Sequence, residues 1–133
     1  MELTIFTDGA SRNNPVEAGA GIFVLQDGKP AEKIARYLGT TTNNIAEYKA
    51  AIIGLEHAVK QGASHVKLNA DSELLVKQVN GQYKVKNEGL RPLYLKVKEL
   101  IAKIGSVEVK YIPREQNKEA DALANMAIDE KIS

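Results

Sequence analysis

The order of the hydrophobic patterns along the chain constrains the fold more than any single residue does. Three strand-like segments come first, at positions 3–8, 19–25 and 32–38, before any helical pattern begins. The Asp-Gly pair at 27–28 favours a hairpin turn between the second and third segments. The opening of the chain therefore predicts a meander of three antiparallel strands.

A long helical pattern follows from about Ile45 to Gln61 and ends at Gly62. The remaining patterns predict a strand, two helices, a strand and a final helix. These are expected at residues 65–70, 72–79, 90–104, 107–112 and 117–130. Strands separated by helices pair in parallel through right-handed crossovers. The sequence therefore predicts an α/β fold with a five-stranded mixed sheet, and we expect one domain over residues 1–133.

Two of the predicted strands are expected to end on an acidic residue. Asp8 precedes a run of glycine, asparagine and proline that is typical of a turn, and by itself an acid before glycine is ordinary turn chemistry. Asp71 ends the fourth strand in the same way. If the two strands are parallel neighbours, both acids lie at the edge of the sheet where ligands of such folds bind.

Two helices supply further acidic residues. Glu47 shares a helix face with small residues, a pattern that lets a helix lie close to a sheet. These residues are Ala50, Ala51, Gly54 and Ala58. A carboxylate on that face is partly desolvated, which is costly unless it is paired or bound to metal. We place Glu47 in the first turn of its helix. Asp121 is expected in the first turn of the last helix, where an interaction with the helix dipole explains it equally well.

Four acids at one edge repel one another and should raise one another's pKa values. Divalent cations resolve this conflict, and an all-oxygen set without cysteine or histidine favours Mg²⁺ or Mn²⁺ over zinc. The sequence contains no cysteine. We therefore expect two Mg²⁺ ions, with Mn²⁺ as a possible substitute. Such a pair activates a water and stabilises the leaving oxygen of a phosphodiester.

Composition and charge indicate the general class of the protein and the character of its surface. Hydrophobic residues make up 44% and charged residues 26% of the chain, which is ordinary for a globular protein. Without a leader pattern or a long apolar run, we expect a cytoplasmic monomer and no membrane partner. Residues 77–114 hold nine lysine and arginine residues against three glutamates. This excess indicates either a solvated surface or a footprint for a polyanion.

Four short motifs carry a family resemblance. They are Thr7-Asp8-Gly9, Thr42-Asn43-Asn44-Ile45-Ala46-Glu47, Asp71-Ser72 and Asn117-Lys118-Glu119-Ala120-Asp121-Ala122-Leu123-Ala124. Together, in this order and spacing, they closely resemble the motifs of type 1 ribonuclease H over essentially the whole chain. The resemblance implies the ribonuclease H-like fold with strand order 3-2-1-4-5. It also implies an endonuclease that hydrolyses the RNA strand of RNA–DNA hybrids, leaving 5′-phosphate and 3′-hydroxyl ends.

The same resemblance implies a role for each of the four acids. Asp8 would bridge both metal ions. Glu47 and Asp71 would hold the ion at the leaving group, and Asp121 would hold the ion that carries the attacking water.

The resemblance also implies five contacts to the hybrid substrate. Asn14, Asn43 and Asn44 match positions that read the RNA minor groove. Their amides can both donate and accept, as a 2′-hydroxyl requires. Thr42 matches a contact to a DNA phosphate, and Asn87 is expected to match a second one.

The chain departs from the family pattern in two places. The loop at 112–117 has no histidine, although many members carry one there, and residues 81–92 replace the basic helical protrusion of some members. A hybrid-binding domain with weak or no turnover is therefore an alternative. A phosphate-accepting signalling domain is a second alternative because it also clusters acids around Mg²⁺. Its sheet is parallel throughout, however, unlike the one expected here.

Overall fold

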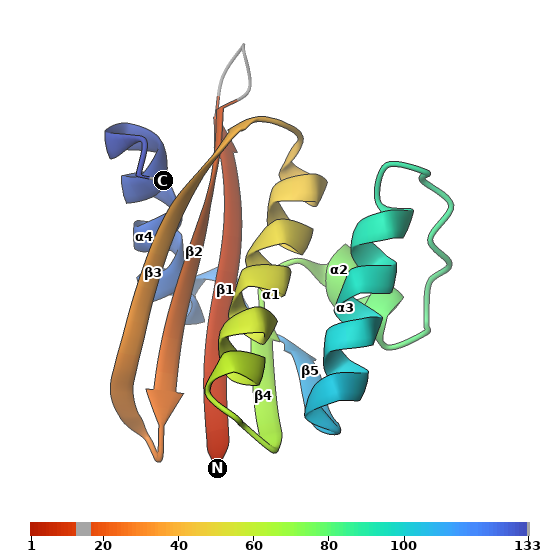
Figure 1. Cartoon of the computed structure of the whole chain (residues 1–133). Helices are drawn as coiled ribbons and strands as arrows, with labels where there is room; N and C mark the ends of the chain where they lie inside the picture. The colour runs from red at the N-terminus through yellow and green to blue at the C-terminus, as the bar shows by residue number, and fades with distance from the viewer. Residues whose placement is uncertain (13–16, 133) are drawn as a thin grey trace.

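A five-stranded sheet carries helices on both of its faces in the computed structural model, which describes residues 1–12 and 17–132 (Figure 1). The strands are β1 (Glu2–Arg12), β2 (Glu17–Gln26), β3 (Lys29–Thr40), β4 (His65–Ala70) and β5 (Ser106–Tyr111). The helices are α1 (Asn43–Lys60), α2 (Glu73–Val79), α3 (Arg91–Ile104) and α4 (Lys118–Glu130), with a 3₁₀ turn at Arg114–Gln116. The strand order β3-β2-β1-β4-β5 confirms the predicted fold.

The strand pairing also follows the prediction. β1, β2 and β3 form an antiparallel meander, while β1, β4 and β5 pair in parallel. Asp27 and Gly28, in the turn between β2 and β3, both have positive φ angles, of 52° and 78°. Such angles suit an Asp-Gly pair in a two-residue hairpin turn, which explains why this turn was visible in the sequence.

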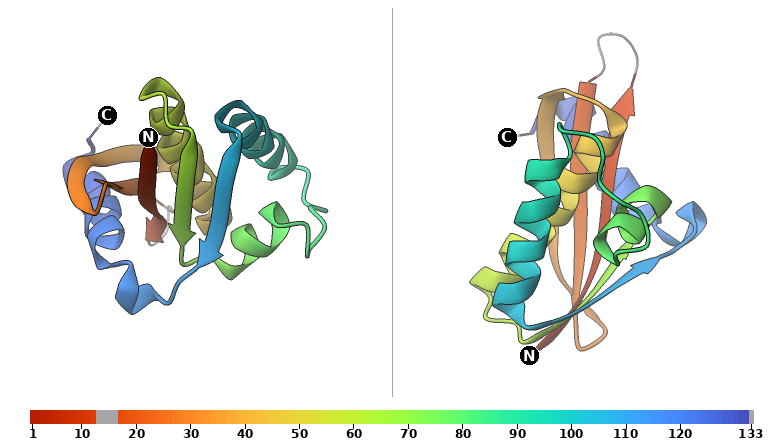
Figure 2. Two further views of the ribbon diagram at one scale, coloured as in Figure 1. Left: turned by 90° about the horizontal axis from the view of Figure 1, so that it is seen from below. Right: turned by 90° about the vertical axis from the view of Figure 1, so that its right-hand side faces the viewer.

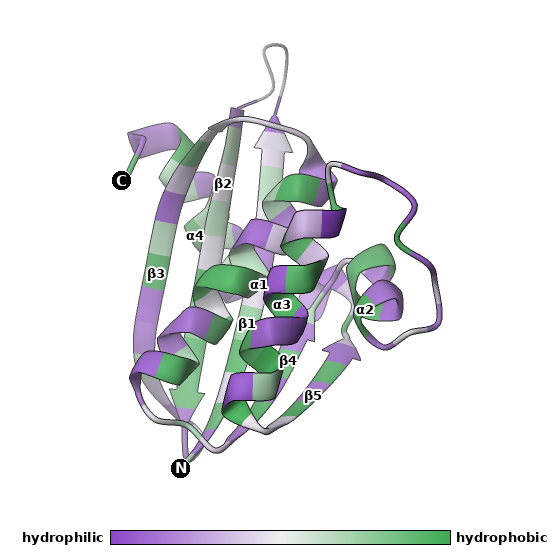
Figure 3. Ribbon diagram, turned by 45° about the vertical axis from the view of Figure 1, so that its right-hand side comes forward, coloured by the Kyte–Doolittle hydropathy of each residue, from purple (hydrophilic) through white to green (hydrophobic). Residues whose placement is uncertain are grey.

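The helices are divided unequally between the two faces of the sheet. α1 and α3 cover one face and α4 lies on the other (Figure 2). The main core lies between α1, α3 and the sheet, and its fully buried residues include Ile5, Ile22 and Leu68. Hydrophilic residues predominate in the loop between α2 and α3, at the margin of this core (Figure 3). No helix in residues 1–12 and 17–132 is long and apolar enough to cross a membrane.

Several element boundaries differ from the predicted ones. α1 begins at Asn43, two residues earlier than expected, because the Thr42 hydroxyl accepts a hydrogen bond from the backbone N–H of Ile45 at 3.3 Å. This is the geometry of an N-cap. β3 covers Lys29–Thr40 instead of 32–38, since its pairing with β2 continues as far as the hairpin turn. The structure also adds the 3₁₀ turn, which the sequence analysis did not predict.

Candidate active site

Asp8 does not end its strand, so this part of the sequence prediction is wrong. β1 continues to Arg12, and Asp8 pairs with Gly21 of β2. On its other side β1 pairs with β4 only as far as Thr7, which lies opposite Ala70. Asp8 is therefore the first residue of β1 beyond the end of β4. It has the stiff support of a paired strand together with access to the sheet edge.

Asp71 and Glu47 meet Asp8 at this edge. Asp71 follows the last residue of β4, and Glu47 belongs to the second turn of α1, not to the first turn as expected. Oxygen atoms of the three carboxylates all lie within 4.8 Å of one another. Asp8 and Glu47 are both only 6% exposed. Three acids from a strand, a helix and a strand end thus converge in a poorly solvated space.

Gly9 allows Glu47 to come this close, and the sequence analysis did not single it out. The backbone N–H of Gly9 donates to Oε1 of Glu47 at 2.5 Å. A Cβ atom on Gly9 would lie 2.2 Å from the carbonyl carbon of Ala46 and 2.3 Å from the backbone nitrogen of Glu47. Any side chain here would therefore collide with the backbone of α1. The signal in the sequence was the glycine that follows the acid.

Asp121 reaches the cluster from the opposite face of the sheet. It lies in the first turn of α4, as expected, and its carboxylate lines the same pocket as that of Asp8. α4 approaches the sheet closely because β2 has glycine where the two meet. A Cβ on Gly21 would lie 2.0 Å from the Ala120 carbonyl oxygen, and one on Gly19 would lie 2.4 Å from that of Ala124.

Basic and amide side chains surround Asp121. Arg114 Nη2 lies 3.6 Å from its carboxylate, and Asn125 Nδ2 lies 3.4 Å away. Arg12, at the end of β1, donates to the Asn125 carbonyl and pairs with Asp129 at 2.6 Å. The sequence analysis assigned no site role to Arg12 or Asn125, since neither stands within the four motifs. Their proximity depends on how α4 crosses β1.

The electrostatics of the cluster are unfavourable for bare carboxylates. Burial raises the pKa of Asp8 to about 9, and the negative charges of Glu47 and Asp71 and a hydrogen bond with Asp121 add to the shift. Burial also raises the pKa of Glu47 to about 8, although the hydrogen bond from Gly9 opposes the increase. In the absence of a cation, protons are therefore held in the cluster at neutral pH.

An open pocket of about 400 Å³ contains the cluster. All four carboxylates line it, together with Arg12, Asn43, Arg114 and four further residues. These are Gly9, Ala10, Ser11 and Asn125. Within the part of the chain that the structure describes, no histidine lines this pocket. The donors are carboxylate oxygens, a set that suits hard divalent cations.

The predicted substrate residues lie at different distances from the acids. Thr42, Asn43 and Asn44 are exposed at the beginning of α1, and Asn43 lines the acidic pocket. Asn87 is exposed in the loop between α2 and α3 and does not line it. Asn14 falls outside the described residues.

Sequence comparison relates the whole chain to known proteins. A family model described as reverse transcriptase-like matches residues 6–127. The chain is 37% identical, over 97% of its length, to the bifunctional protein Rv2228c of Mycobacterium tuberculosis, of which it spans only 36%. It is also 37% identical, over 94% of its length, to ribonuclease HI of Halobacterium salinarum, of which it spans 63%.

Solved structures give the same relationship. The crystal structure of RNase H1 from Halobacterium salinarum matches with a TM-score of 0.94 and 35% identity, covering 98% of this chain and 99% of that one. LC11-RNase H1, solved in complex with an RNA/DNA hybrid, matches with a TM-score of 0.91 and 37% identity over the same shares. Sequence, fold and the acidic cluster agree: the chain belongs to the type 1 ribonuclease H family.

Proposed function

We propose that the chain is a ribonuclease H that hydrolyses the RNA strand of RNA–DNA hybrids, leaving 5′-phosphate and 3′-hydroxyl ends. The convergence of Asp8, Glu47 and Asp71 within 4.8 Å is the observation that supports this most strongly. The similarity to LC11-RNase H1, whose structure contains an RNA/DNA hybrid, supports the choice of substrate. Residues 1–133 would act as one catalytic domain.

The cluster fits two divalent cations, Mg²⁺ or in its place Mn²⁺. Asp8 shares the close cluster with Glu47 and Asp71 and the pocket with Asp121, so it is the residue that we expect to contact both ions. Bound ions would supply a nucleophilic water and neutralise charge on the leaving oxygen. The protein contributes stiffness, because β1 fixes Asp8 and the Gly9 N–H fixes Glu47.

Two of the proposed substrate residues make one hydrogen bond within the protein and keep another hydrogen-bonding group available for the substrate. Thr42 Oγ1 accepts from Ile45, so its hydroxyl proton is free to be donated to a phosphate. Asn87 Oδ1 accepts from Gly89 N–H at 2.7 Å, which leaves its NH₂ group for a phosphate. Asn43 and Asn44 are exposed at the beginning of α1, Asn43 in the lining of the acidic pocket, and both would contact 2′-hydroxyls. The proposal includes Asn14 from the sequence pattern alone.

A hybrid-binding domain with weak turnover is the second candidate. It is favoured by one observation, that no histidine lines the pocket among residues 1–12 and 17–132. Proton transfer to the leaving group would then depend on water. Hybrid binding without cleavage in either Mg²⁺ or Mn²⁺ would favour this candidate.

The test is cleavage of an end-labelled RNA–DNA hybrid in Mg²⁺ and in Mn²⁺, beside double-stranded RNA and double-stranded DNA. We expect cleavage of the RNA strand of the hybrid and its loss in Asp8→Asn. Asp27→Asn is the matched control, because Asp27 is exposed in the turn between β2 and β3. Cleavage that persists in Asp8→Asn would refute the assigned mechanism.

A further inference from the structure

Asn117 is a buried polar residue that belongs to none of the roles assigned so far. It immediately precedes α4 and is 1% exposed. Its side-chain Nδ2 donates to the backbone carbonyl of Thr7 at 2.9 Å. Thr7 is the last residue of β1 that pairs with β4, and it directly precedes Asp8. The side chain of Asn117 thus holds β1 at the point where the acidic cluster begins.

The backbone of Asn117 is bonded to the other side of the same cluster. Its carbonyl oxygen accepts a hydrogen bond from the N–H of Asp121 at 3.0 Å. One residue therefore links the neighbour of Asp8, through its side chain, to Asp121, through its main chain. The carboxylates of Asp8 and Asp121 line the same pocket on either side of this link.

The position is not optimised for the stability of α4 alone. Asparagine before a helix usually accepts a hydrogen bond from an N–H of the first turn. Asn117 makes no such side-chain cap. Its Oδ1 is buried without a hydrogen-bond partner among the described residues, which is a cost to stability. The side chain serves the connection between α4 and β1 instead.

The other hydrogen bonds that we find between the α4 region and the sheet lie farther along the chain. Arg12 contacts the Asn125 carbonyl and Asp129, Lys131 donates to Glu17, and the Tyr37 N–H donates to the Ile132 carbonyl. These bonds fix the later part of α4. The beginning of the helix, which carries Asp121, is joined to β1 by Asn117.

We propose that Asn117 is a positioning residue that sets the separation of Asp8 and Asp121 and thereby the affinity of the site for divalent cations. The inference rests on the proposed metal-dependent function. It assigns to Asn117 no contact with substrate or metal. A link of this kind acts like the outer partners of metal ligands, whose loss typically lowers metal affinity or activity by about 10–100-fold.

The test compares Asn117→Ser with Asn80→Ser. Serine can cap α4 but is too short to keep the bond to Thr7. Asn80 is the matched control, because its Nδ2 donates to the Val109 carbonyl at 3.0 Å, at the end of α2 and away from the pocket. Mn²⁺ affinity is measured by calorimetry on the nucleic-acid-free protein, and kcat and KM are measured on the hybrid.

We expect Asn117→Ser to weaken Mn²⁺ binding about tenfold and to lower kcat about tenfold, while KM for the hybrid stays within about twofold. Asn80→Ser should change neither Mn²⁺ affinity nor kcat, even if both variants melt earlier. All measurements are repeated in trimethylamine oxide, which maintains a folded population of either variant. Equal Mn²⁺ affinity and kcat in the two variants would overturn the role of Asn117. A wild-type chain that neither binds Mn²⁺ nor cleaves would instead overturn the proposed function.

Discussion

At the scale of single residues, the site depends on small groups as much as on the acids themselves. Gly9 lets α1 approach β1 and gives Glu47 its hydrogen bond, while Gly21 lets α4 bring Asp121 to Asp8. A carboxylate that is held by a backbone N–H cannot move away from its neighbours to relieve repulsion. The glycines therefore help to impose the electrostatic conflict that a cation would relieve.

Replacing Gly9 by alanine should destabilise the protein strongly. The new methyl group would overlap backbone atoms of α1 at 2.2–2.4 Å, and backbone cannot rotate out of the way as a flexible side chain can. We expect a loss of about 3 kcal/mol in the free energy of unfolding, measured with urea. The control is Gly89→Ala, since among the residues that the structure describes the only atom near a Cβ there is the side-chain oxygen of Asn87, at 3.1 Å. Similar losses in both variants would contradict this explanation.

At the scale of helices and strands, local patterns predicted the elements well and their ends less well. The segment His65–Ala70 was predicted to the residue as a buried strand, because Gly62 ends the helix before it and Asp71-Ser72 follows it. The predicted end of β1 was wrong because Gly9 and the residues after it have the sequence pattern of a turn. In the structure β2 pairs with β1 as far as Arg12. That pairing is a tertiary property, since it requires the partner strand.

The grouping of the four acids could be predicted because the topology brings β1, the end of β4 and the early turns of α1 and α4 to one edge of the sheet. The hydrogen bonds and ion pairs that hold these acids and their helices in place could not be predicted. Asn117 and Thr7 are 110 residues apart, and nothing local in either position indicates the other. Arg12 is a further example, because its partner Asp129 lies 117 residues away. Such contacts follow from the register of α4 on the sheet, which short motifs do not encode.

The N-cap of α1 provides a prediction at this scale. The hydroxyl of Thr42 accepts from Ile45 at the end of α1 that carries Glu47. Thr42→Ala should lower the free energy of unfolding by about 1 kcal/mol. Thr42→Ser should retain most of the stabilisation from the cap, because serine caps equally well. Thermal and urea unfolding of both variants would measure this. If serine were as destabilising as alanine, the capping hydrogen bond would not be the cause.

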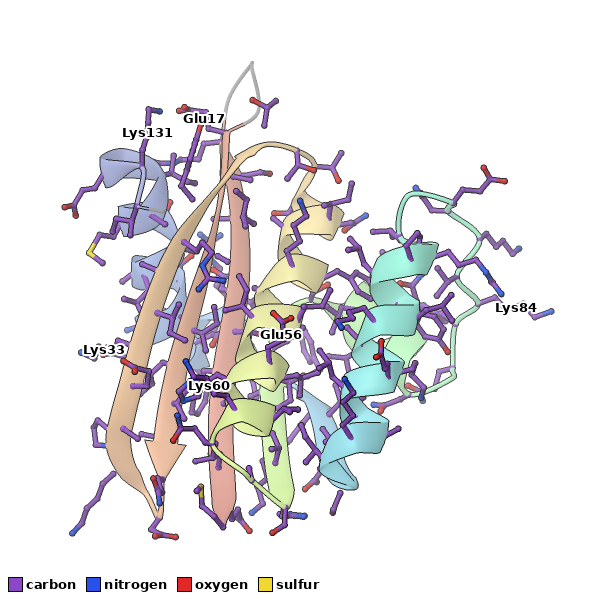
Figure 4. All side chains as sticks on the ribbon, in the orientation of Figure 1. Glu17, Lys33, Glu56, Lys60, Lys84 and Lys131 are labelled. Carbon is purple, nitrogen blue, oxygen red and sulfur yellow. The ribbon has the colours of Figure 1, made fainter. Side chains whose placement is uncertain are left out.

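At the scale of the whole molecule, a group of basic residues lies outside the lining of the acidic pocket. The loop between α2 and α3 carries Lys84 and Lys86, and Arg91 begins α3. Figure 4 shows Lys84 projecting outward from this loop, far from Lys60 near the end of α1. If hybrid phosphates contact this loop, affinity should fall steeply with salt, because each contact releases counterions.

Substituting Lys84 and Lys86 together by alanine should therefore reduce the salt dependence of hybrid binding. The slope of the logarithm of the binding constant against the logarithm of salt concentration should become shallower by about 1–2. Fluorescence anisotropy with a labelled hybrid, in Ca²⁺ or without metal, would measure it. Lys60→Ala is the control and should leave the slope unchanged. An unchanged slope in the double variant would place the hybrid elsewhere.

The acidic cluster should also couple the stability of the whole protein to pH and to metal. In the metal-free protein, burial raises the pKa of Asp8 from an ordinary 3.8 to about 9 and that of Glu47 from 4.5 to about 8. Above about pH 5 the unfolded chain releases protons that the folded protein retains. The free energy of unfolding must then fall as the pH rises toward about 9, since the folded state binds more protons.

Asp8→Asn should remove much of this dependence and stabilise the metal-free protein at pH 7 by about 2 kcal/mol, although it abolishes cleavage. Mg²⁺ should flatten the slope of the wild type, because bound cations favour the ionised carboxylates and bind only the folded state. Urea unfolding at pH 5, 7 and 9, in EDTA and in Mg²⁺, would measure both effects, with Asp27→Asn as the control. If the stability of Asp8→Asn in EDTA changed with pH as that of the wild type does, Asp8 would not be the source of the coupling. An Mg²⁺ effect of equal size in Asp8→Asn would show that the cation binds without Asp8, which would exclude it as the shared ligand.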